Sequence, residues 1–152
     1  MSKKIKNIFV EGAIPPEKIA HMIGHHQSKT NIGAHDVFLG QVRADEIDGK
    51  TVAAIEFTAH EEMALQSAYE VRERVFAKYP DLTCAHILHS LGTVKAGELC
   101  LVVFVSSGHR DSSFKACQEM TEGIKKEVAI FGKELFEDGS HQWKENKEVH
   151  NG

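Results

Sequence analysis

Positively charged side chains gather in one stretch of this sequence, residues 101–134, which is expected to form a strand followed by a helix. The apolar run Leu101–Val105 is rich in β-branched residues and predicts a buried strand. A Ser-Ser-Gly segment ends this run, and His109 and Arg110 follow directly. A guanidinium group and the free N–H groups of a helix N-terminus can bind one phosphate or carboxylate together. The stretch therefore predicts a site for a small anion.

The helix after Arg110 is expected to begin at Asp111 or Ser112, either of which can cap it, and to run to about residue 131. At 100° per residue, its apolar stripe leaves Lys125 roughly 80° from the stripe's centre and Lys126 roughly 180° away. Lys125 can therefore lean toward a cleft, while Lys126 points to solvent. Partial desolvation would lower the pKa of such an amine and let it act as an acid, a base or a nucleophile. The stripe consists of Phe114, Cys117, Met120, Ile124, Val128 and Phe131.

Each of these residues also has an ordinary structural interpretation. His109 can satisfy backbone groups at the start of the helix, and Arg110 can pair with a nearby carboxylate. The lysines can form a solvated basic face beside neighbouring glutamates. Arg43, at the end of an expected strand, can be an exposed surface charge.

Three histidines, His21, His25 and His26, lie on a helix expected over residues 16–26, with Pro16 tolerated at its start. His21 and His25 have the i, i+4 spacing of a metal-binding pair. The glutamate of the HExxH motif is missing, and no third ligand is evident. We therefore interpret them as surface histidines and expect no metal site.

Composition places the chain among ordinary globular proteins. It has 152 residues, 41% of them hydrophobic and 26% charged, which predicts one domain over residues 1–144 with a polar tail at 145–152. A formal charge of −4 argues against nucleic-acid binding. No apolar run is long enough for a membrane span, and no secretory signal is visible. The three cysteines, which form no CxxC pair, predict buried thiols and a cytoplasmic location.

The order of expected elements is typical of the α+β class. Strands are expected at 4–11, 31–44, 51–58, 82–91 and 101–105, with long helices at 61–78 and 111–131 and a turn at 137–140. Hairpins near 44–51 and 92–98 favour a mixed, mostly antiparallel sheet packed by the two long helices.

Several short motifs occur in an order known from one family. They are Gly33-Ala34 with Phe38-Leu39-Gly40-Gln41-Val42-Arg43, Glu61-Glu62-Met63-Ala64, His89 with Gly92, Gly97-Glu98, His109-Arg110 with Phe114 and Ala116, Ile124-Lys125-Lys126-Glu127-Val128, Lys133-Glu134, and Asp138-Gly139 with Trp143. Together they make the chain resemble the large, catalytic subunit of molybdopterin synthase over nearly its whole length.

This resemblance implies an α/β hammerhead fold and a sulfur-transfer enzyme that needs no cofactor. The family converts cyclic pyranopterin monophosphate (precursor Z) to molybdopterin. The dithiolene sulfur comes from the C-terminal Gly-Gly thiocarboxylate of a small ubiquitin-like carrier subunit. The large subunit forms a homodimer with one carrier docked at each end, which makes a heterotetramer.

The resemblance also implies roles for individual residues. Lys125 would be the catalytic lysine near the carrier's C-terminus, acting in proton transfer or stabilising negative charge on a tetrahedral adduct. Arg43, His109 and Arg110 would hold the phosphate or pterin of the substrate. These groups must then meet in one pocket, within one chain or across a subunit boundary.

The chain departs from the family pattern at two positions of interest. Gly132 stands where the family has a second active-site lysine, and Ser90 stands where it has an arginine. Glycine tolerates backbone conformations that other residues avoid, so Lys133 is expected to take over the lost lysine. Glu134 is expected to serve the site by orienting a lysine, or else to be that lysine's surface partner.

Two other functions are consistent with the sequence. A paralogue with the same fold and partner could be non-catalytic, because Gly132 and Ser90 alter the site. A phosphate-binding module unrelated to sulfur is supported only by the Gly-His-Arg helix start.

Overall fold

The computed structural model describes residues 5–144. Along the chain the elements are β1 (Phe9–Glu11), α1 (Pro16–His26), β2 (Ala34–Gln41), β3 (Glu46–Ile47), β4 (Lys50–Ala59), α2 (Glu61–Lys78), β5 (Leu82–Lys95), β6 (Leu99–Ser107), α3 (Arg110–Glu127), β7 (Ile130–Phe136) and β8 (His141–Trp143). The strands form one sheet in the order β2-β6-β5-β4-β7-β8, with β1 added to β5 and β3 to β4.

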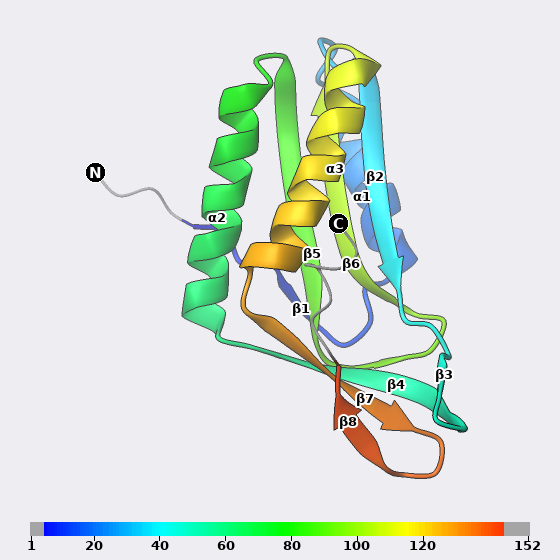
Figure 1. Ribbon diagram of the computed structural model, residues 1–152. Coiled ribbons are helices and arrows are strands. Elements are labelled where there is room, and N and C mark those ends of the chain that lie inside the picture. The colour runs from blue at the N-terminus through cyan, green and yellow to red at the C-terminus, as the bar shows by residue number, and fades with distance from the viewer. Residues whose placement is uncertain (1–4, 145–152) are drawn as a thin grey trace.

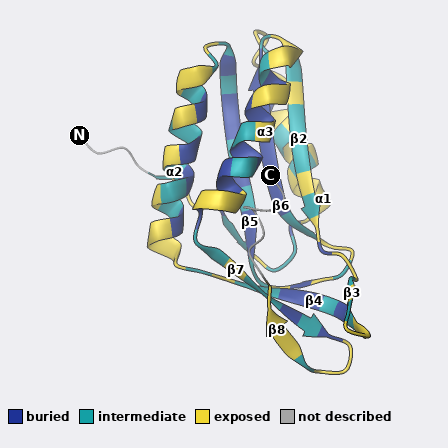
Figure 2. Ribbon diagram, viewed as in Figure 1, coloured by how far each residue is buried: buried dark blue, intermediate teal, exposed yellow. Residues whose placement is uncertain are grey.

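The upper part of the sheet is covered by helices on both faces (Figures 1 and 2). The apolar run in β6 lies at its centre, between β2 and β5, and its two sets of alternating side chains pack on opposite faces. Val103 and Val105 pack in the core beneath α2 and α3. Val102 and Phe104 pack on the opposite side, with residues of α1. Burial on both faces explains why this strand is continuously apolar.

The lower part of the sheet consists of β4, β7 and β8 together with the end of β5. β5 pairs with β6 as far as His89 and with β4 from Gly92 to Lys95, so the same strand belongs to both parts. Gly92, at a φ of 84°, provides the bend between them. The sequence predicted a turn at 92–97, whereas the strand continues to Lys95 before the turn at Gly97. Backbone pairing with β4 keeps residues 92–95 in the strand.

The helix expected at 111–131 has different ends in the structure. α3 begins at Arg110 with His109 as its N-cap residue, and neither Asp111 nor Ser112 caps it. It ends at Glu127, and Phe131 lies in β7 instead of on the helix. The apolar residues from position 128 onward fit a strand as well as a helix, and pairing with β4 decides between them.

The remaining expectations on the fold are largely confirmed. The fold is α+β, with antiparallel pairs throughout the sheet except for the parallel pair β1–β5. The first hairpin turns through Asp48 and Gly49, both at positive φ, and the second joins β5 to β6. The first strand is shorter than expected. None of the helices in residues 5–144 combines the length and the apolar character that a membrane crossing requires. The polar tail expected at 145–152 lies outside the described residues, and the single-domain assignment stays a prediction.

Candidate active site

Lys125 lies in the last turn of α3, at the edge of the helix's buried face. Its neighbour Ile124 is buried in the core, whereas Lys126 forms a surface ion pair with Glu122 at 3.6 Å. Desolvation by the surrounding protein lowers the pKa of Lys125, although the residue as a whole is exposed, and the positive charge of Lys144 lowers it further. The Lys125 amine therefore loses its proton more easily than an ordinary exposed lysine does.

Residues from two central strands lie within electrostatic range of the Lys125 amine. His89 is buried in β5, where its Nδ1 lies 2.8 Å from the Ser90 carbonyl oxygen. Desolvation lowers the pKa of His89 to about 4, with a smaller contribution from the charge of Lys125, so the ring is neutral at pH 7. Cys100 of β6 is half-buried, and desolvation raises the pKa of its thiol against the opposing charges of Lys125 and Lys144. We call Lys125, His89, Cys100 and Lys144 the lysine cluster.

The hairpin β7–β8 brings Lys144 to this cluster. Lys133 is directly opposite Trp143, and the Lys144 N–H donates to the Gly132 carbonyl oxygen at 2.7 Å. Lys144 is thus opposite Gly132, and opposed residues of antiparallel strands share a face. A Cβ at Gly132 would lie 3.5 Å from Phe57, whose ring packs edge-on against His89 at 5.1 Å between centroids. The face of Gly132 and Lys144 is therefore the face that approaches the lysine cluster.

Lys133 lies on the opposite face of β7. Its ammonium group pairs with Glu56 at 3.1 Å and lies 5.6 Å from the centre of the Trp143 ring. The structure does not bring it to the lysine cluster, because successive residues of a strand alternate faces. Glu134 shares the face of Gly132 but is buried and accepts a hydrogen bond from Gln142 Nε2 at 3.0 Å.

Arg43 lies two residues beyond the end of β2. That end of β2 is at the same end of the sheet as the C-terminus of α3 (Figure 1). Three residues before Arg43, the Gly40 carbonyl oxygen accepts a hydrogen bond from the Cys100 thiol of the lysine cluster at 3.6 Å. The Arg43 side chain is 77% exposed and is paired with Asp45 at 3.2 Å. An exposed pair of this kind is weak and is easily exchanged for a ligand phosphate.

His109 and Arg110 lie at the other end of α3. Fifteen residues separate Arg110 from Lys125, which at ~1.5 Å per residue places their backbones about 22 Å apart. The His109 N–H donates to an Asp81 carboxylate oxygen at 3.2 Å, and a hydrogen bond from Ser112 is the main cause of a lowered Asp81 pKa. A carboxylate of the protein thus occupies part of the expected anion site. Within one chain, Arg110 and Lys125 do not meet in one pocket.

The histidines of α1 also differ from expectation. His21 and His25 are exposed, but His26 is buried, with 3% of its surface accessible, and so is not a surface histidine. It ends the helix on the inward side, where its ring packs 5.4 Å from that of Phe104. The cysteines agree with expectation: all three are free, with Cys84 and Cys117 buried and Cys100 half-buried.

Comparison with known proteins assigns the chain to a family. The family model described as MoaE protein matches residues 11–127. The chain belongs to the MoaE family. A protein of Aedes aegypti named molybdopterin synthase catalytic subunit 1 is 42% identical over 118 residues, which cover 76% of each chain.

Solved structures of the MoaE fold agree with this assignment. The crystal structure of molybdopterin synthase from Staphylococcus aureus superposes with a TM-score of 0.79 at 26% identity, covering 93% of this chain and 99% of that one. A complex of subunits 1 and 2 of molybdopterin-converting factor from Helicobacter pylori matches with a TM-score of 0.76 at 18% identity, covering 90% and 88% of the two chains. At 18% identity, the Helicobacter pylori structure supports the fold alone.

Sequence reasoning missed three members of the lysine cluster in this MoaE protein. His89 was noticed only as part of a motif, and Cys100 only as a buried thiol. No local pattern in the sequence identifies Lys144 as a site residue, because its position depends on the register of β8 against β7. The strand alternation of 132, 133 and 134 could have shown that Lys133 and the family lysine position face opposite ways.

Proposed function

We propose that this protein is the catalytic subunit of a molybdopterin synthase and transfers sulfur from a thiocarboxylated carrier protein to a cyclic pterin phosphate. Membership of the MoaE family supports the enzyme class. The observation that carries the site assignment is the lowered pKa of Lys125 within a cluster built from α3, β5, β6 and the residue that follows β8. The relatives matched are named catalytic subunits, so the non-catalytic alternative gains no support.

The chemistry proposed for Lys125 follows from its environment. Sulfur transfer forms a carbon–sulfur bond on the substrate and breaks the acyl–sulfur bond of the carrier, whose acyl carbon becomes a carboxylate as water adds. Addition of water to the acyl carbon gives a tetrahedral intermediate with a negative oxygen, and collapse of this intermediate leaves the sulfur on the substrate and a carboxylate on the carrier. The attacking water loses a proton in this sequence, so a group that accepts protons is required. An amine with a lowered pKa gives up its proton more readily than an ordinary lysine does, and the free amine can then take a proton back. We assign Lys125 this acid–base role at the carrier's thiocarboxylate.

Lys144 is proposed as the second positive group of the site. It lies opposite Gly132, the position of the family's second lysine, and its charge acts on both Lys125 and Cys100. A positive charge there would hold an anionic thiocarboxylate or phosphate beside the Lys125 amine. The role expected for Lys133 stays a prediction, and its pairing with Glu56 makes it the natural comparison for Lys144.

Arg43 is proposed to complete the cationic surface at this end of the sheet, and His109 and Arg110 to act from a second copy of the chain. At ~1.5 Å per helical residue, Arg110 and Lys125 are about 22 Å apart along α3. Both residues of one chain therefore cannot contact the same small substrate. A homodimer that places the start of α3 of one copy beside the lysine cluster of the other would bring them together.

The carrier protein is proposed to dock beside β7 and β8. Phe131 is 53% exposed and Trp143 58% exposed, and both lie on the face of the hairpin that also carries Lys133. Exposed aromatic side chains are typical anchors of protein interfaces. A partner seated there would lie across the hairpin from the lysine cluster, and its flexible C-terminal tail would pass the edge of β8 to enter the cluster.

Reconstitution tests the proposed function. Purified protein is mixed with thiocarboxylated carrier and precursor Z, and the dithiolene product is measured. Formation of product in proportion to thiocarboxylate consumed is expected. Absence of product, with the carrier bound and the fold intact, would contradict the assignment. Binding of precursor Z without any binding of the carrier would instead favour the phosphate-binding module.

Mixing inactive variants tests the two-copy arrangement. Lys125→Ala and Arg110→Ala proteins are each expected to be inactive or strongly impaired as homodimers. Mixed dimers contain one site with both residues intact, so activity should return after subunit exchange. A mixture no more active than its components would show that the two residues serve the same chain's site or none.

A further inference from the structure

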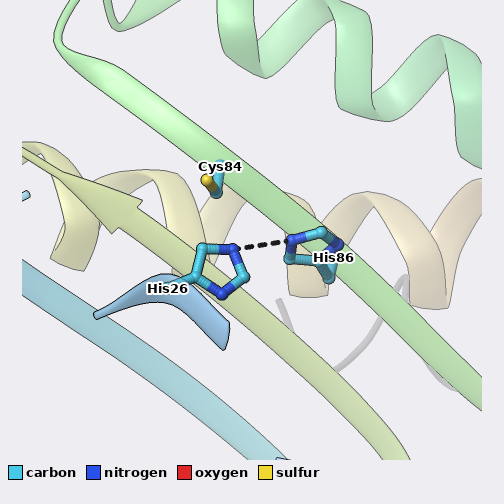
Figure 3. A group of neighbouring side chains, drawn as sticks. All are labelled: His26, Cys84 and His86. Atoms are coloured by element: carbon cyan, nitrogen blue, oxygen red, sulfur yellow. Dashed lines mark hydrogen bonds between the residues drawn. The ribbon is translucent and has the colours of Figure 1, made fainter. Parts of the chain in front are cut away.

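A second cluster of titratable side chains lies on the face of the sheet that α1 covers, away from the lysine cluster. His26 comes from the end of α1, and Cys84 and His86 come from the same face of β5 (Figure 3). One ligand atom from each, an imidazole nitrogen or the thiol sulfur, lies within 4.8 Å of the others. His26 and Cys84 are buried, and His86 is half-buried.

We propose that His26, Cys84 and His86 form a binding site for a zinc ion or a similar borderline-soft divalent metal. Imidazole nitrogen and thiolate sulfur are the ligands that zinc prefers, and three protein ligands with one solvent position is a common arrangement. The mechanism proposed for sulfur transfer uses none of these residues.

The spacing of the nitrogen atoms fits tetrahedral coordination. His26 Nε2 and His86 Nε2 lie 3.1 Å apart. Two nitrogens bound to one zinc at ~2.0–2.1 Å and a tetrahedral angle are about 3.4 Å apart, and a nitrogen and a sulfur at ~2.3 Å are about 3.6 Å apart. Small side-chain rotations would therefore bring all three atoms to bonding distance.

The hydrogen bonds around His26 prepare its Nε2 as a ligand. His26 Nδ1 lies 2.6 Å from the Met22 carbonyl oxygen, which can only accept, so Nδ1 carries the proton and Nε2 has a free lone pair. Such a hydrogen bond from the outer nitrogen to a backbone carbonyl is the usual support of a metal-binding histidine. In the metal-free protein the same lone pair accepts a hydrogen bond from His86 Nε2.

The His86 ring has the neutral form that a metal ligand needs. Desolvation, with smaller contributions from neighbouring positive charges, lowers the pKa of His86 to about 4, so this ring is neutral at pH 7. Its proton can move to Nδ1 when Nε2 binds a metal. The Lys29 ammonium group donates a hydrogen bond to Cys84 Sγ at 3.3 Å, so the sulfur faces polar groups on this side of the sheet.

His86 is the member of the cluster that borders a cavity. His86 lines a cavity of about 870 Å³ that is bordered by α1, α2 and β5. The fourth coordination position is therefore assigned to solvent that enters from this cavity.

Titration of the metal-free protein with Zn²⁺, and separately with Co²⁺, tests the site. One equivalent of metal is expected to bind, with a thiolate-to-cobalt charge-transfer absorption in the Co²⁺ form. Cys84→Ser should remove that absorption, and Cys84→Ser and His86→Ala should each weaken Zn²⁺ binding by at least about tenfold. His21→Ala, which removes an exposed histidine of the same helix, should leave the affinity unchanged.

Several results would overturn the proposal. They are the absence of stoichiometric binding, a Co²⁺ spectrum without thiolate absorption, and equal affinities for wild type and the Cys84 and His86 variants. Loss of affinity in His21→Ala would place the metal on the surface instead. The thermal unfolding of each metal-free variant shows whether it is folded, and the wild-type Co²⁺ spectrum decides the question without any variant.

Discussion

A lysine at position 132 should substitute for Lys144 in the proposed site. In the proposed site, Lys144 replaces the lysine that Gly132 has lost, because the two residues are opposite each other on one face of the hairpin. Lys144→Ala should therefore lower kcat/KM for sulfur transfer. Adding Gly132→Lys to that variant should restore much of the activity.

The structure sets the size of both effects. Lys144 holds an anion without being the proton-transfer group, so its loss should cost about 10- to 100-fold, or ~1.4–2.7 kcal/mol, which is less than removal of a direct oxyanion donor costs. A Cβ at Gly132 would lie 3.0 Å from Ile55 Cγ2, so Ile55 must move by a few tenths of an ångström. We expect a stability cost of about 1 kcal/mol and a fall in Tm of about 2–4 °C for a chain of this length.

The assay is single-turnover sulfur transfer at a saturating concentration of thiocarboxylated carrier, so that docking does not limit the rate, with Lys133→Ala as the matched control. Lys133 is one residue from Gly132 but faces Glu56 and Trp143, so its loss should change the rate less than twofold. If Lys144→Ala retains the wild-type rate while Lys133→Ala loses it, the reasoning from strand register is refuted. Failure of Gly132→Lys to restore activity in a folded double variant would also contradict it.

Three further predictions concern stability. Gly123→Ala in α3 should lower the free energy of unfolding by about 1–3 kcal/mol despite the better helix propensity of alanine, because its Cβ would lie 2.7 Å from Val71 Cγ1; equal or greater stability by urea denaturation would show that α2 and α3 can separate. Ser90→Ala should be neutral or stabilising by up to about 1 kcal/mol, since Ser90 Oγ is buried with no hydrogen-bond partner among residues 5–144; a loss above that amount would reveal a partner. Because the pKa of His89 is lowered to about 4, the unfolded chain binds the proton first, and His89 alone should lower the free energy of unfolding by roughly 3 kcal/mol as the pH drops from about 6.5 to 4. His86, whose pKa is also lowered to about 4, adds to the total fall, so the His89 contribution is the difference between wild type and His89→Gln; equal pH profiles for the two proteins would exclude His89 as a cause.

Local periodicity was sufficient for the parts of the site that lie on one helix. It distinguished Lys125 at the edge of the buried face from Lys126, which forms a solvent-exposed pair with Glu122. It failed at the end of α3, where residues 128–131 fit either a helix or a strand and only pairing with β4 decides. Local periodicity indicates which residues share one face of an element, but it does not indicate which distant strand the element pairs with.

Contacts between distant segments could not be predicted in this way. Lys144 reaches the lysine cluster only because β8 pairs with β7 in one register. His26 and His86 are 60 residues apart and meet because α1 packs on the same face of the sheet. The separation of Arg110 from Lys125 was in principle predictable, since fifteen residues of one helix span about 22 Å.

The most direct test of the proposed sulfur-transfer site is single-turnover transfer by two adjacent lysine variants. Lys125→Ala should lower the rate by about 10²–10⁴-fold, the usual contribution of a general acid or base, while carrier binding and Tm stay at wild-type values. Lys126→Ala removes an equal charge one residue away, from a surface pair with Glu122, and should change the rate less than twofold. Equal rates for Lys125→Ala and wild type, or equal losses in both variants, would contradict the assignment of the lysine cluster as the active site.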